Sequence, residues 1–327
     1  MTRPMYSKTF CLVCFLALIA AGCSDTGGSG EPIAGTKFSP VVGRWDVSVE
    51  DPGGAYPSWF EIQEEGGELS GRFVGQFGSA RPIADIRFDG EQLRFTLPPQ
   101  YERQTDDLLF IGRVADQEIV GETYGASGQN IQFTARRAPA LDSDAAPVWG
   151  QPIQLIRGDL SNWTLRNPEG PKGWTIKDGV LTNTPPSIDL ITTDKFGDFK
   201  LHVEFNMPPE SNSGVYLRGR YEVQIQDDYG KEPESRRCGG IYGFLTPTKL
   251  AAKPPGEWNT YDITLIGRRV TVVLNGETII DGVEIPGITG GALDSREGES
   301  GPLMLQGDHR AIRYRNLVLT PAQTKNE

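Results

Sequence analysis

The sequence predicts an all-β protein built from two domains, and three observations support this. First, short segments in which apolar and polar side chains alternate are separated by turns containing Gly, Asn and Asp. Second, the C-terminal half shows no convincing helical periodicity. Third, the chain of 327 residues is interrupted at residues 136–152 (RRAPALDSDAAPVWGQP) by a stretch with three Pro, four Ala and no periodic apolar face. We therefore expect one β domain on each side of this linker, which we place at 138–150.

The N-terminus has the layout of an export signal. Residues 1–22 carry two basic side chains and then an apolar run that is shorter than the roughly 20 residues of a membrane-spanning helix. The segment LIAAGC resembles a bacterial lipobox, in which Cys23 becomes the lipidated first residue; an ordinary secretory signal is the alternative. Residues 23–39 contain SDTGGSGEPIAGT, which is typical of a flexible tether. These features predict an exported protein that is lipid-anchored in the cell envelope, at the outer membrane or facing the periplasm.

Cysteine usage and charge narrow the class of protein further. Two of the four Cys lie in the signal and a third is Cys23, so Cys238 has no partner for an intramolecular disulfide. The formal net charge is −11, and it becomes −13 without residues 1–22, which hold two basic and no acidic residues. This charge disfavours nucleic acid as a partner and suits a neutral polar ligand such as a carbohydrate.

Residues 40–137 are expected to form an antiparallel β-barrel or a small sandwich. Strand-like segments such as GRWDVSVE, ELSGRFVGQF and NIQFTARR follow one another, with turns every eight to twelve residues. Gly43 and Trp45 near the start resemble the Gly-x-Trp that closes one end of lipocalin-type barrels. For Trp45, Tyr56 and Trp59 we favour core packing over ligand contact.

Residues 151–321 are expected to form a concanavalin-like jelly roll of two packed sheets. DFKLHVEFNM separates an apolar face from a charged one, and TYDITLIG and RRVTVVLNGETII follow as further strands. The second of these includes Asn275 and Gly276, a favoured hairpin turn. Trp258 is expected to be a structural anchor and His202 a surface residue. This number and length of strands is typical of a β-sandwich.

The segment NSGVYLRGRYEVQIQDD, residues 212–228, carries the candidate site. With a period of two residues, Val215 and Leu217 face the space between the sheets, as do apolar residues of the next strand. If RGRY is a tight turn, the polar residues of both strands lie side by side on the opposite face. These polar residues are Tyr216, Arg218, Arg220, Glu222, Gln224 and Gln226. A solvated strand surface is the alternative, but Arg, Tyr, Glu and Gln without Lys or Ser favour a binding or catalytic surface.

Several segments, in order, resemble the bacterial 3-keto-disaccharide hydrolase domain family over most of residues 155–320. The segments are SIDLIT, DFKLHVEF, NSGVYLRG, RYEVQIQDD, CGGIYG, PPGEWNTYDITLIGRRVTVVLNG and GPLMLQGDHRAIRYRN. The resemblance implies a concanavalin-like fold and cleavage of glycosides already oxidised to a ketone at C3. One departure is Arg310, which follows the GDH segment where family members often have Gly, and its larger side chain is expected to narrow or recharge the pocket.

A C3 ketone makes the proton on C2 acidic, so cleavage by β-elimination followed by water addition needs a base, a cation for the enolate oxygen and an acid for the leaving group. We nominate Glu222 as the base or a metal ligand, Arg218 for the enolate oxygen and His309 as the acid or a ligand. A purely structural Glu222–Arg218 ion pair and a turn role for His309 are the alternatives. The substrate-binding candidates are Glu204, Tyr216, Gln224, Gln226, Asp227 and Gln306. The sequence makes no cofactor certain, and a divalent metal held by Glu222, Asp227 and His309 is left open.

Two other functions are consistent with the sequence. A retaining glycosidase on the same fold would use Glu204 and Glu222, with carboxyl groups about 5 to 5.5 Å apart. A lipid-anchored carbohydrate-binding protein without catalysis would use the same Arg, Gln and Tyr side chains to hold sugar hydroxyls.

Overall fold

A computed structural model describes residues 38, 40–102, 105–124, 128–141 and 146–323. The described residues belong to one compact unit. Cys23 and the predicted export signal lie outside the described residues. Among those described, no helix has the length and apolar character needed to cross a bilayer.

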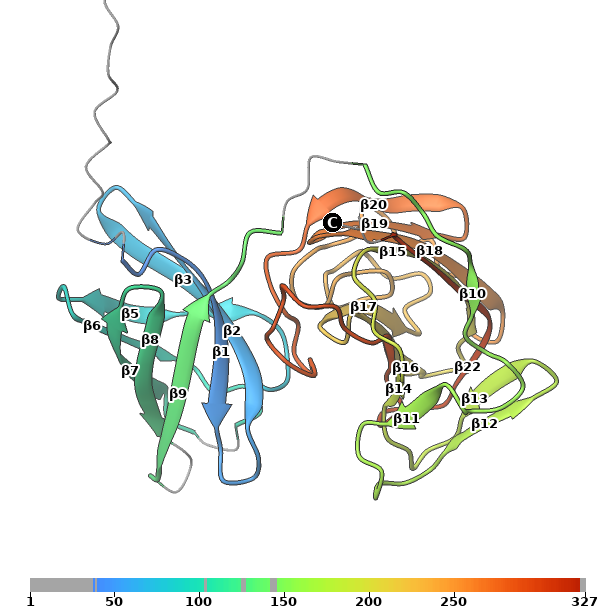
Figure 1. Cartoon of the computed structure of the whole chain (residues 1–327), viewed down its shortest axis with the longest axis horizontal. Coiled ribbons are helices and arrows are strands. Elements are labelled where there is room, and N and C mark those ends of the chain that lie inside the picture. Colours follow the sequence, from blue (N-terminus) through green and yellow to red (C-terminus); the bar gives the residue numbers. More distant parts are fainter. Residues whose placement is uncertain (1–37, 39, 103–104, 125–127, 142–145, 324–327) are drawn as a thin grey trace, which may run out of the picture. The chain divides into compact units, whose positions relative to one another are not determined.

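The first nine strands form one antiparallel sheet that nearly closes into a barrel (Figure 1). They are β1 (Gly43–Glu50), β2 (Tyr56–Glu65), β3 (Glu68–Val74), β4 (Arg81–Pro82), β5 (Ala84–Phe88), β6 (Gln92–Leu97), β7 (Leu108–Ala115), β8 (Glu118–Tyr124) and β9 (Asn130–Arg137). Their order is β4-β3-β2-β1-β9-β8-β7-β6-β5. The Ile83 amide, between β4 and β5, donates to the Gly71 carbonyl at 3.0 Å. This contact brings the two ends of the sheet together, and the predicted antiparallel barrel is confirmed.

The barrel core is built by alternation along each strand. Val47 and Val49 of β1 are fully buried, and their neighbours on the strand are partly exposed. Trp45 is also fully buried; its Nε1 donates to the Val41 carbonyl at 3.0 Å, and the Arg137 guanidinium lies 3.9 Å from its ring centre. Trp45 is therefore a core residue, as predicted.

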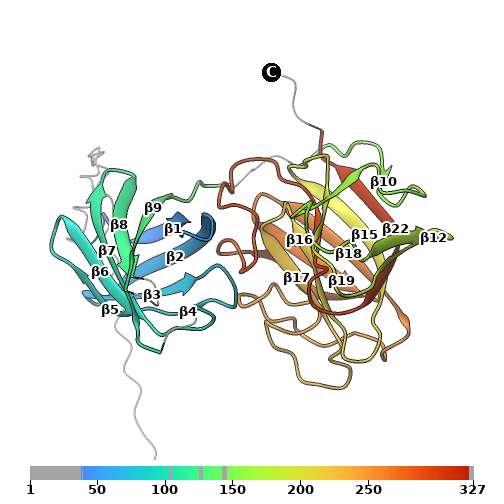
Figure 2. The same ribbon diagram turned by 90° about the horizontal axis from the view of Figure 1, so that it is seen from below.

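Strands β10 to β22 form two antiparallel sheets packed face to face, and Figure 2 shows β16 and β17 layered over β15, β18 and β19. One sheet holds β10 (Ile153–Gln154), β12 (Trp174–Lys177), β13 (Val180–Asn183), β15 (Phe199–Asn206), β18 (Trp258–Ile266), β19 (Arg269–Leu274), β20 (Glu277–Glu284) and β22 (Ile312–Pro321). The other holds β11 (Trp163–Leu165), β14 (Leu190–Thr192), β16 (Asn212–Leu217), β17 (Tyr221–Gln226) and β21 (Met304–Leu305). The predicted two-sheet sandwich is confirmed.

Side-chain alternation on β15, β16 and β17 fills the space between these sheets. The apolar residues of the three strands are almost completely buried in one cluster: Phe199, Leu201, Val203, Phe205, Val215, Leu217, Tyr221, Val223 and Ile225. Their polar neighbours consequently point away from the sandwich core. Those of β15 lie on one outer face and those of β16 and β17 on the other, because the strands belong to different sheets.

The barrel and the sandwich are joined by packed contacts. Trp59 of β2 is fully buried and meets the Phe244 ring edge-on, with 5.4 Å between the ring centres. A Cβ at Gly287 would lie 2.2 Å from the Trp59 Nε1, so only Gly allows the indole this close. The Gly291 amide donates to the Gln76 carbonyl at 2.8 Å. Trp59 is therefore packed as predicted, although partly against the sandwich, and the loop after β3 is fixed to the segment around 287–291.

Candidate active site

A cavity of about 1400 Å³ is lined by the outward-facing polar residues of β16 and β17. The two strands pair with Tyr216 opposite Glu222 and Gly214 opposite Gln224. Among the residues predicted from sequence, those that line this cavity are Tyr216, Glu222, Gln224, Gln226, Gln306 and His309. The period-two argument therefore placed four of its six polar residues correctly on this surface, namely Tyr216, Glu222, Gln224 and Gln226.

Glu222 is a buried carboxyl group in this cavity, with 3% of its surface exposed. Its side chain extends across Gly214, where a Cβ would lie 2.3 Å from the Glu222 Oε1, so a larger residue would displace the carboxyl group. Burial raises the pKa of Glu222 to about 8, although the Tyr216 hydroxyl and the charge of His309 oppose this shift. A carboxyl group with a pKa near neutrality is suited to proton transfer.

The Tyr216 hydroxyl connects Glu222 to a backbone carbonyl. It lies 2.9 Å from Glu222 Oε2 and 2.9 Å from the Gly290 oxygen. A tyrosine hydroxyl has one proton to donate. When Glu222 is protonated it can donate to Tyr216, which donates to Gly290; when Glu222 is ionised, Tyr216 can donate to the carboxylate. The same pair thus supports both protonation states of Glu222.

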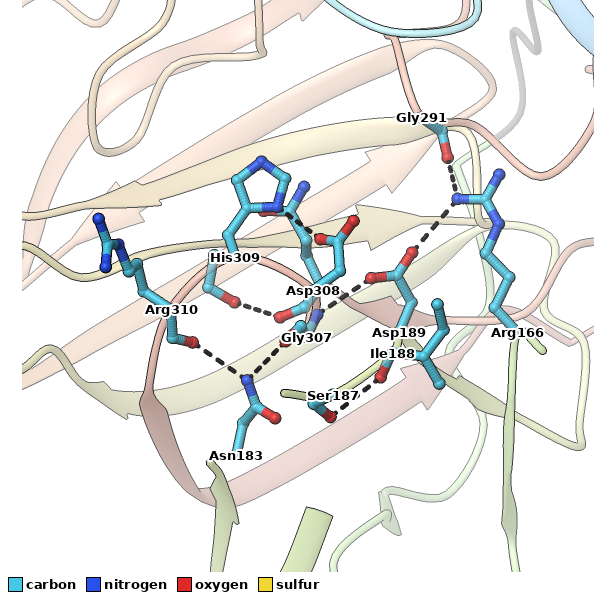
Figure 3. Close-up of polar contacts among 12 residues, drawn as sticks. Arg166, Asn183, Ser187, Ile188, Asp189, Gly291, Gly307, Asp308, His309 and Arg310 are labelled. Atoms are coloured by element: carbon cyan, nitrogen blue, oxygen red, sulfur yellow. Dashed lines mark hydrogen bonds and ion pairs between the residues drawn. The ribbon is translucent and has the colours of Figure 1, made fainter. Parts of the chain in front are cut away.

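His309 and Asp308 form the second ionisable pair in the cavity (Figure 3). The Asp308 carboxylate lies 2.5 Å from His309 Nδ1, and this hydrogen bond raises the pKa of His309. Both side chains are a little less than half exposed, so a ligand can reach them. A histidine held by a carboxylate is suited to carry a proton near neutral pH.

Arg166 and Asp189 form a third charged pair in the cavity lining (Figure 3). Arg166 Nη1 donates to Asp189 at 3.2 Å and to the Gly291 carbonyl at 2.8 Å. Asp189 also accepts from the Gly307 amide at 3.0 Å; burial raises its pKa, while this hydrogen bond and Arg166 oppose the rise. Arg166 thus brings a permanent positive charge to the cavity, on the side where the barrel loop is attached.

The amide side chains provide hydrogen bonds for a polar ligand. Gln224 Nε2 lies 3.3 Å from Gln226 Oε1 and 3.4 Å from the Arg236 carbonyl. Gln306 Oε1 is buried and has no hydrogen-bond partner among the residues that the structure describes. An unpartnered acceptor in a cavity wall is costly unless a ligand or water donates to it. A hydroxyl group of a sugar would satisfy it.

Arg218 does not lie in this cavity, so its predicted place beside Glu222 is wrong. The RGRY segment is the tight turn that was expected, with positive φ at Arg218 (53°) and Gly219 (68°), and alternation along the strand stops there. The Arg218 guanidinium instead donates to the Gly267 carbonyl at 2.5 Å and to the Tyr221 hydroxyl at 3.3 Å. Arg220 is likewise held elsewhere, by Asp294 at 2.7 Å.

Glu204 and Asp227 also lie outside the cavity lining. Glu204 projects from the outer face of the opposite sheet, where Arg315 donates to it at 2.6 Å. Asp227 follows the end of β17 and accepts from the Glu210 amide at 3.0 Å. The predicted substrate-binding role of these two residues is therefore not supported by their positions, and Glu204 cannot form a carboxylate pair with Glu222 across a sugar.

Within the described residues, no group of three or more His, Cys, Asp or Glu side chains could hold a metal ion. Glu222, Asp227 and His309 are consequently not arranged as the ligand set that the sequence left open. Cys238 is buried, and its Sγ lies 3.3 Å from the Tyr261 hydroxyl. Arg310 is adjacent to His309 but is not among the residues that line the cavity, so the expected narrowing of the pocket is not seen.

Three functional candidates were missed by the reasoning from sequence: Arg166, Asp189 and Asp308. Asp189 lies in the SIDLIT segment and Asp308 precedes His309 in GDH. Both therefore belong to segments that carry the family resemblance, and this was the signal that could have identified them. Arg166 follows the three-residue strand β11 in a segment without periodicity, which gave no signal.

The family relationship agrees with this geometry. The family described as the 3-keto-alpha-glucoside-1,2-lyase-like domain matches residues 152–320, just over half of the chain. This chain belongs to that family. The matched residues include β16 and β17, which form the cavity wall of the sandwich, and include no residue of the barrel.

Individual relatives are more distant. A 3-keto-disaccharide hydrolase of Bacteroides thetaiotaomicron is 24% identical over 147 residues, which cover 34% of this chain and 50% of that protein. The chain therefore matches about half the length of this curated relative. A provisionally named glycosyl hydrolase of Parabacteroides distasonis is 30% identical, with a TM-score of 0.45 over 55% of this chain and 93% of that one. A carbohydrate-binding module of Bacillus subtilis is 12% identical, with a TM-score of 0.34. This match covers 50% of this chain and 97% of that one.

Proposed function

We propose that this protein cleaves the glycosidic bond of glycosides oxidised at C3, by β-elimination and water addition. Membership of the 3-keto-alpha-glucoside-1,2-lyase-like family supports the substrate class. The observation that carries the mechanism is Glu222: a buried carboxyl group with a pKa of about 8, hydrogen-bonded to Tyr216, in a cavity large enough for a sugar.

Glu222 acts as the base in this mechanism. The ionised carboxylate removes the proton from C2, and the electrons of the C–H bond form an enolate with the C3 oxygen. The enolate then returns its electrons, so that a C1–C2 double bond forms and the C1–O bond breaks. Water adds across the double bond, with oxygen on C1 and a proton on C2, and the net reaction is hydrolysis. The raised pKa makes the ionised Glu222 a stronger base than an ordinary glutamate.

Arg166 and His309 supply the two remaining roles. Arg166 has a cationic guanidinium with N–H groups beyond those bonded to Asp189, Gly291 and Ala292, and these stabilise the enolate oxygen. The hydrogen bond to Asp308 raises the pKa of His309 and so favours its protonated form, which gives its proton to the leaving oxygen. Arg166 thereby takes the role that the sequence had suggested for Arg218.

We also propose that the mature protein is exported and attached to the cell envelope through lipidated Cys23. The sequence LIAAGC and the Gly- and Ser-containing tether support this. Metabolic labelling with a palmitate analogue tests it, because a Cys23→Ser variant should lose the label and be released into the soluble fraction. Labelling that persists in that variant would contradict the proposal.

The enzymatic proposal is tested by incubating the purified protein with the 3-keto derivatives of several disaccharides and with the parent disaccharides, and following release of the leaving sugar. We expect turnover of the 3-keto compounds alone. In deuterated water, the product should carry deuterium at C2, because that proton is removed and replaced. Turnover of the unoxidised disaccharides without deuterium at C2 would favour an ordinary glycosidase, and no turnover of either would favour a binding protein.

A further inference from the structure

The cavity that holds Glu222 has a second wall supplied by the barrel. The loops that follow β3 and β6, together with the last residue of β8, contribute three exposed aromatic side chains to the lining: Phe77, Tyr101 and Tyr124, which are 49%, 61% and 37% exposed. Among the described residues, only one other aromatic side chain, Tyr229, is in this exposed class. Scattered exposed aromatic residues are common, but three that line one cavity indicate a surface built for contact.

We propose that these three side chains, the aromatic wall, form a subsite for the leaving sugar of a 3-keto-disaccharide. This rests on the proposed function and adds a role for the barrel, which lies outside the segment shared with the family. The oxidised ring lies against Glu222 and the amide side chains of β17. The second sugar ring then extends from C1 towards the barrel and stacks its C–H face on the aromatic wall.

The loop that carries Tyr101 is held in place by polar contacts of Glu102. The Glu102 carboxylate accepts hydrogen bonds from the backbone amides of Gln100 at 2.6 Å and Tyr101 at 3.0 Å. It also forms an ion pair with buried Arg81 at 2.5 Å. A Cβ at Gly78 would lie 2.7 Å from the Tyr101 ring, so Gly at this position allows the ring to pack. The Tyr101 backbone is thus fixed while its ring remains exposed, and little entropy is lost when a ligand binds.

The aromatic wall is linked directly to the catalytic residues. Tyr216, the partner of Glu222, has its hydroxyl 2.9 Å from the Gly290 oxygen. The next residue, Gly291, donates to Gln76 at 2.8 Å, and Gln76 precedes Phe77. The same segment accepts a hydrogen bond from Arg166. The backbone of residues 290–291 therefore contacts both the tyrosine that holds the base and the barrel loop. These contacts fix the two walls of the cavity relative to each other.

The chemistry of this wall suits a sugar more than a flat aromatic group. Amide and carboxylate side chains lie among the rings in the lining, namely Gln76, Gln100, Glu102 and Gln129. Rings provide apolar faces for C–H groups, while amides and carboxylates bond to hydroxyls. The cavity volume of about 1400 Å³ also exceeds what one sugar ring fills.

The test compares two kinds of substrate with the full mature protein. The first kind is the 3-keto-disaccharides made from trehalose, maltose and cellobiose, and the second is methyl 3-keto-α-glucoside, which lacks a second ring. For Tyr101→Ala and Phe77→Ala we expect kcat/KM on the best disaccharide to fall about fivefold to tenfold, mainly through KM. The methyl glycoside should change less than twofold. Tyr229→Ala is the matched control, because Tyr229 is 57% exposed but is not in the lining. Equal losses on both substrates, or no loss on either, would overturn the proposal.

If none of the 3-keto compounds is turned over, the proposed reaction is refuted, but the subsite is not and can still be tested. In that case, calorimetry with the unoxidised disaccharides measures binding directly. We expect the Phe77→Ala/Tyr101→Ala double variant to bind the best of them at least tenfold more weakly than Tyr229→Ala does. Equal affinity in these two proteins, both shown to be folded by thermal denaturation, would refute the subsite.

Discussion

Two glutamates on opposite outer faces of the sandwich have opposite properties. Glu204 of β15 lies beside Arg315 and Asn316. Burial alone would raise its pKa, but the hydrogen bonds from Asn316 and Arg315 lower it. Glu222 of β17 has a neutral tyrosine as its hydrogen-bond partner, and burial raises its pKa to about 8. Both residues follow the same rule of alternation in their strands.

Hydrogen-bond partners and burial, more than position on a strand, therefore determine what a carboxyl group can do. An arginine neighbour makes Glu204 an ordinary ionised surface group. Glu222 is only 3% exposed and is hydrogen-bonded to the neutral Tyr216 hydroxyl, which leaves it poised to exchange a proton.

Glu222→Gln should abolish turnover of 3-keto-glycosides, with a loss of at least about 100-fold, because the amide cannot accept the C2 proton. Its effect on stability should have the opposite sign. The pKa of Glu222 is raised from 4.5 to about 8, so its contribution to stability is present below pH 4.5 and is lost as the pH rises through 8. Thermal denaturation at pH 8 should show a higher Tm for the variant than for the wild type. An active Glu222→Gln protein would remove Glu222 from the role of base.

His309→Asn should lower the rate according to the leaving group. A methoxide leaving group needs a proton, so methyl 3-keto-glucoside should react about 10-fold to 100-fold more slowly. A p-nitrophenolate leaving group is stable without a proton, so the p-nitrophenyl analogue should lose less than about threefold. Release of methanol and of p-nitrophenol measures the two rates. Equal losses on both substrates would contradict the assignment of His309 as the acid.

The pH dependence of kcat/KM should report Glu222 in the free enzyme. With the p-nitrophenyl substrate, whose leaving group needs no proton from His309, we expect the rate to rise with pH and to level off above about pH 8, because only ionised Glu222 removes the C2 proton. Tyr216→Phe removes a hydrogen bond that lowers this pKa, so the rise should move to higher pH. The maximal rate should fall by about tenfold or less. A profile that is the same in wild type and Tyr216→Phe would show that the group titrating is not Glu222.

The sequence predicted the two-sheet sandwich, the barrel and the core of the candidate site, because alternation persists along β16 and β17. It failed for Arg218 because the turn, with its positive φ, ends the alternation. It failed for Glu204 because alternation tells which face of a strand a residue occupies, but not to which sheet the strand belongs. Arg166 and the barrel loops reach the cavity through tertiary contacts such as that of Gly291 with Gln76, which no local pattern records.

The smallest effect is expected on the other face. Glu204→Gln should leave kcat/KM within about twofold of the wild type, because Glu204 lies outside the cavity. It should lower stability by about 1 kcal/mol or less at neutral pH, through loss of the ion pair with Arg315, whose side chain is 40% exposed.

This loss should also depend on pH in the sense opposite to that of Glu222. A lowered pKa contributes stability above the ordinary value of 4.5, and that stability disappears as the pH falls through the folded-state pKa. Urea denaturation at pH 7 and pH 3 measures the difference, which should shrink at the lower pH. If Glu204→Gln instead impaired turnover as much as Glu222→Gln, the two outer faces would be functionally coupled, and the assignment of chemistry to the β16–β17 face alone would fail.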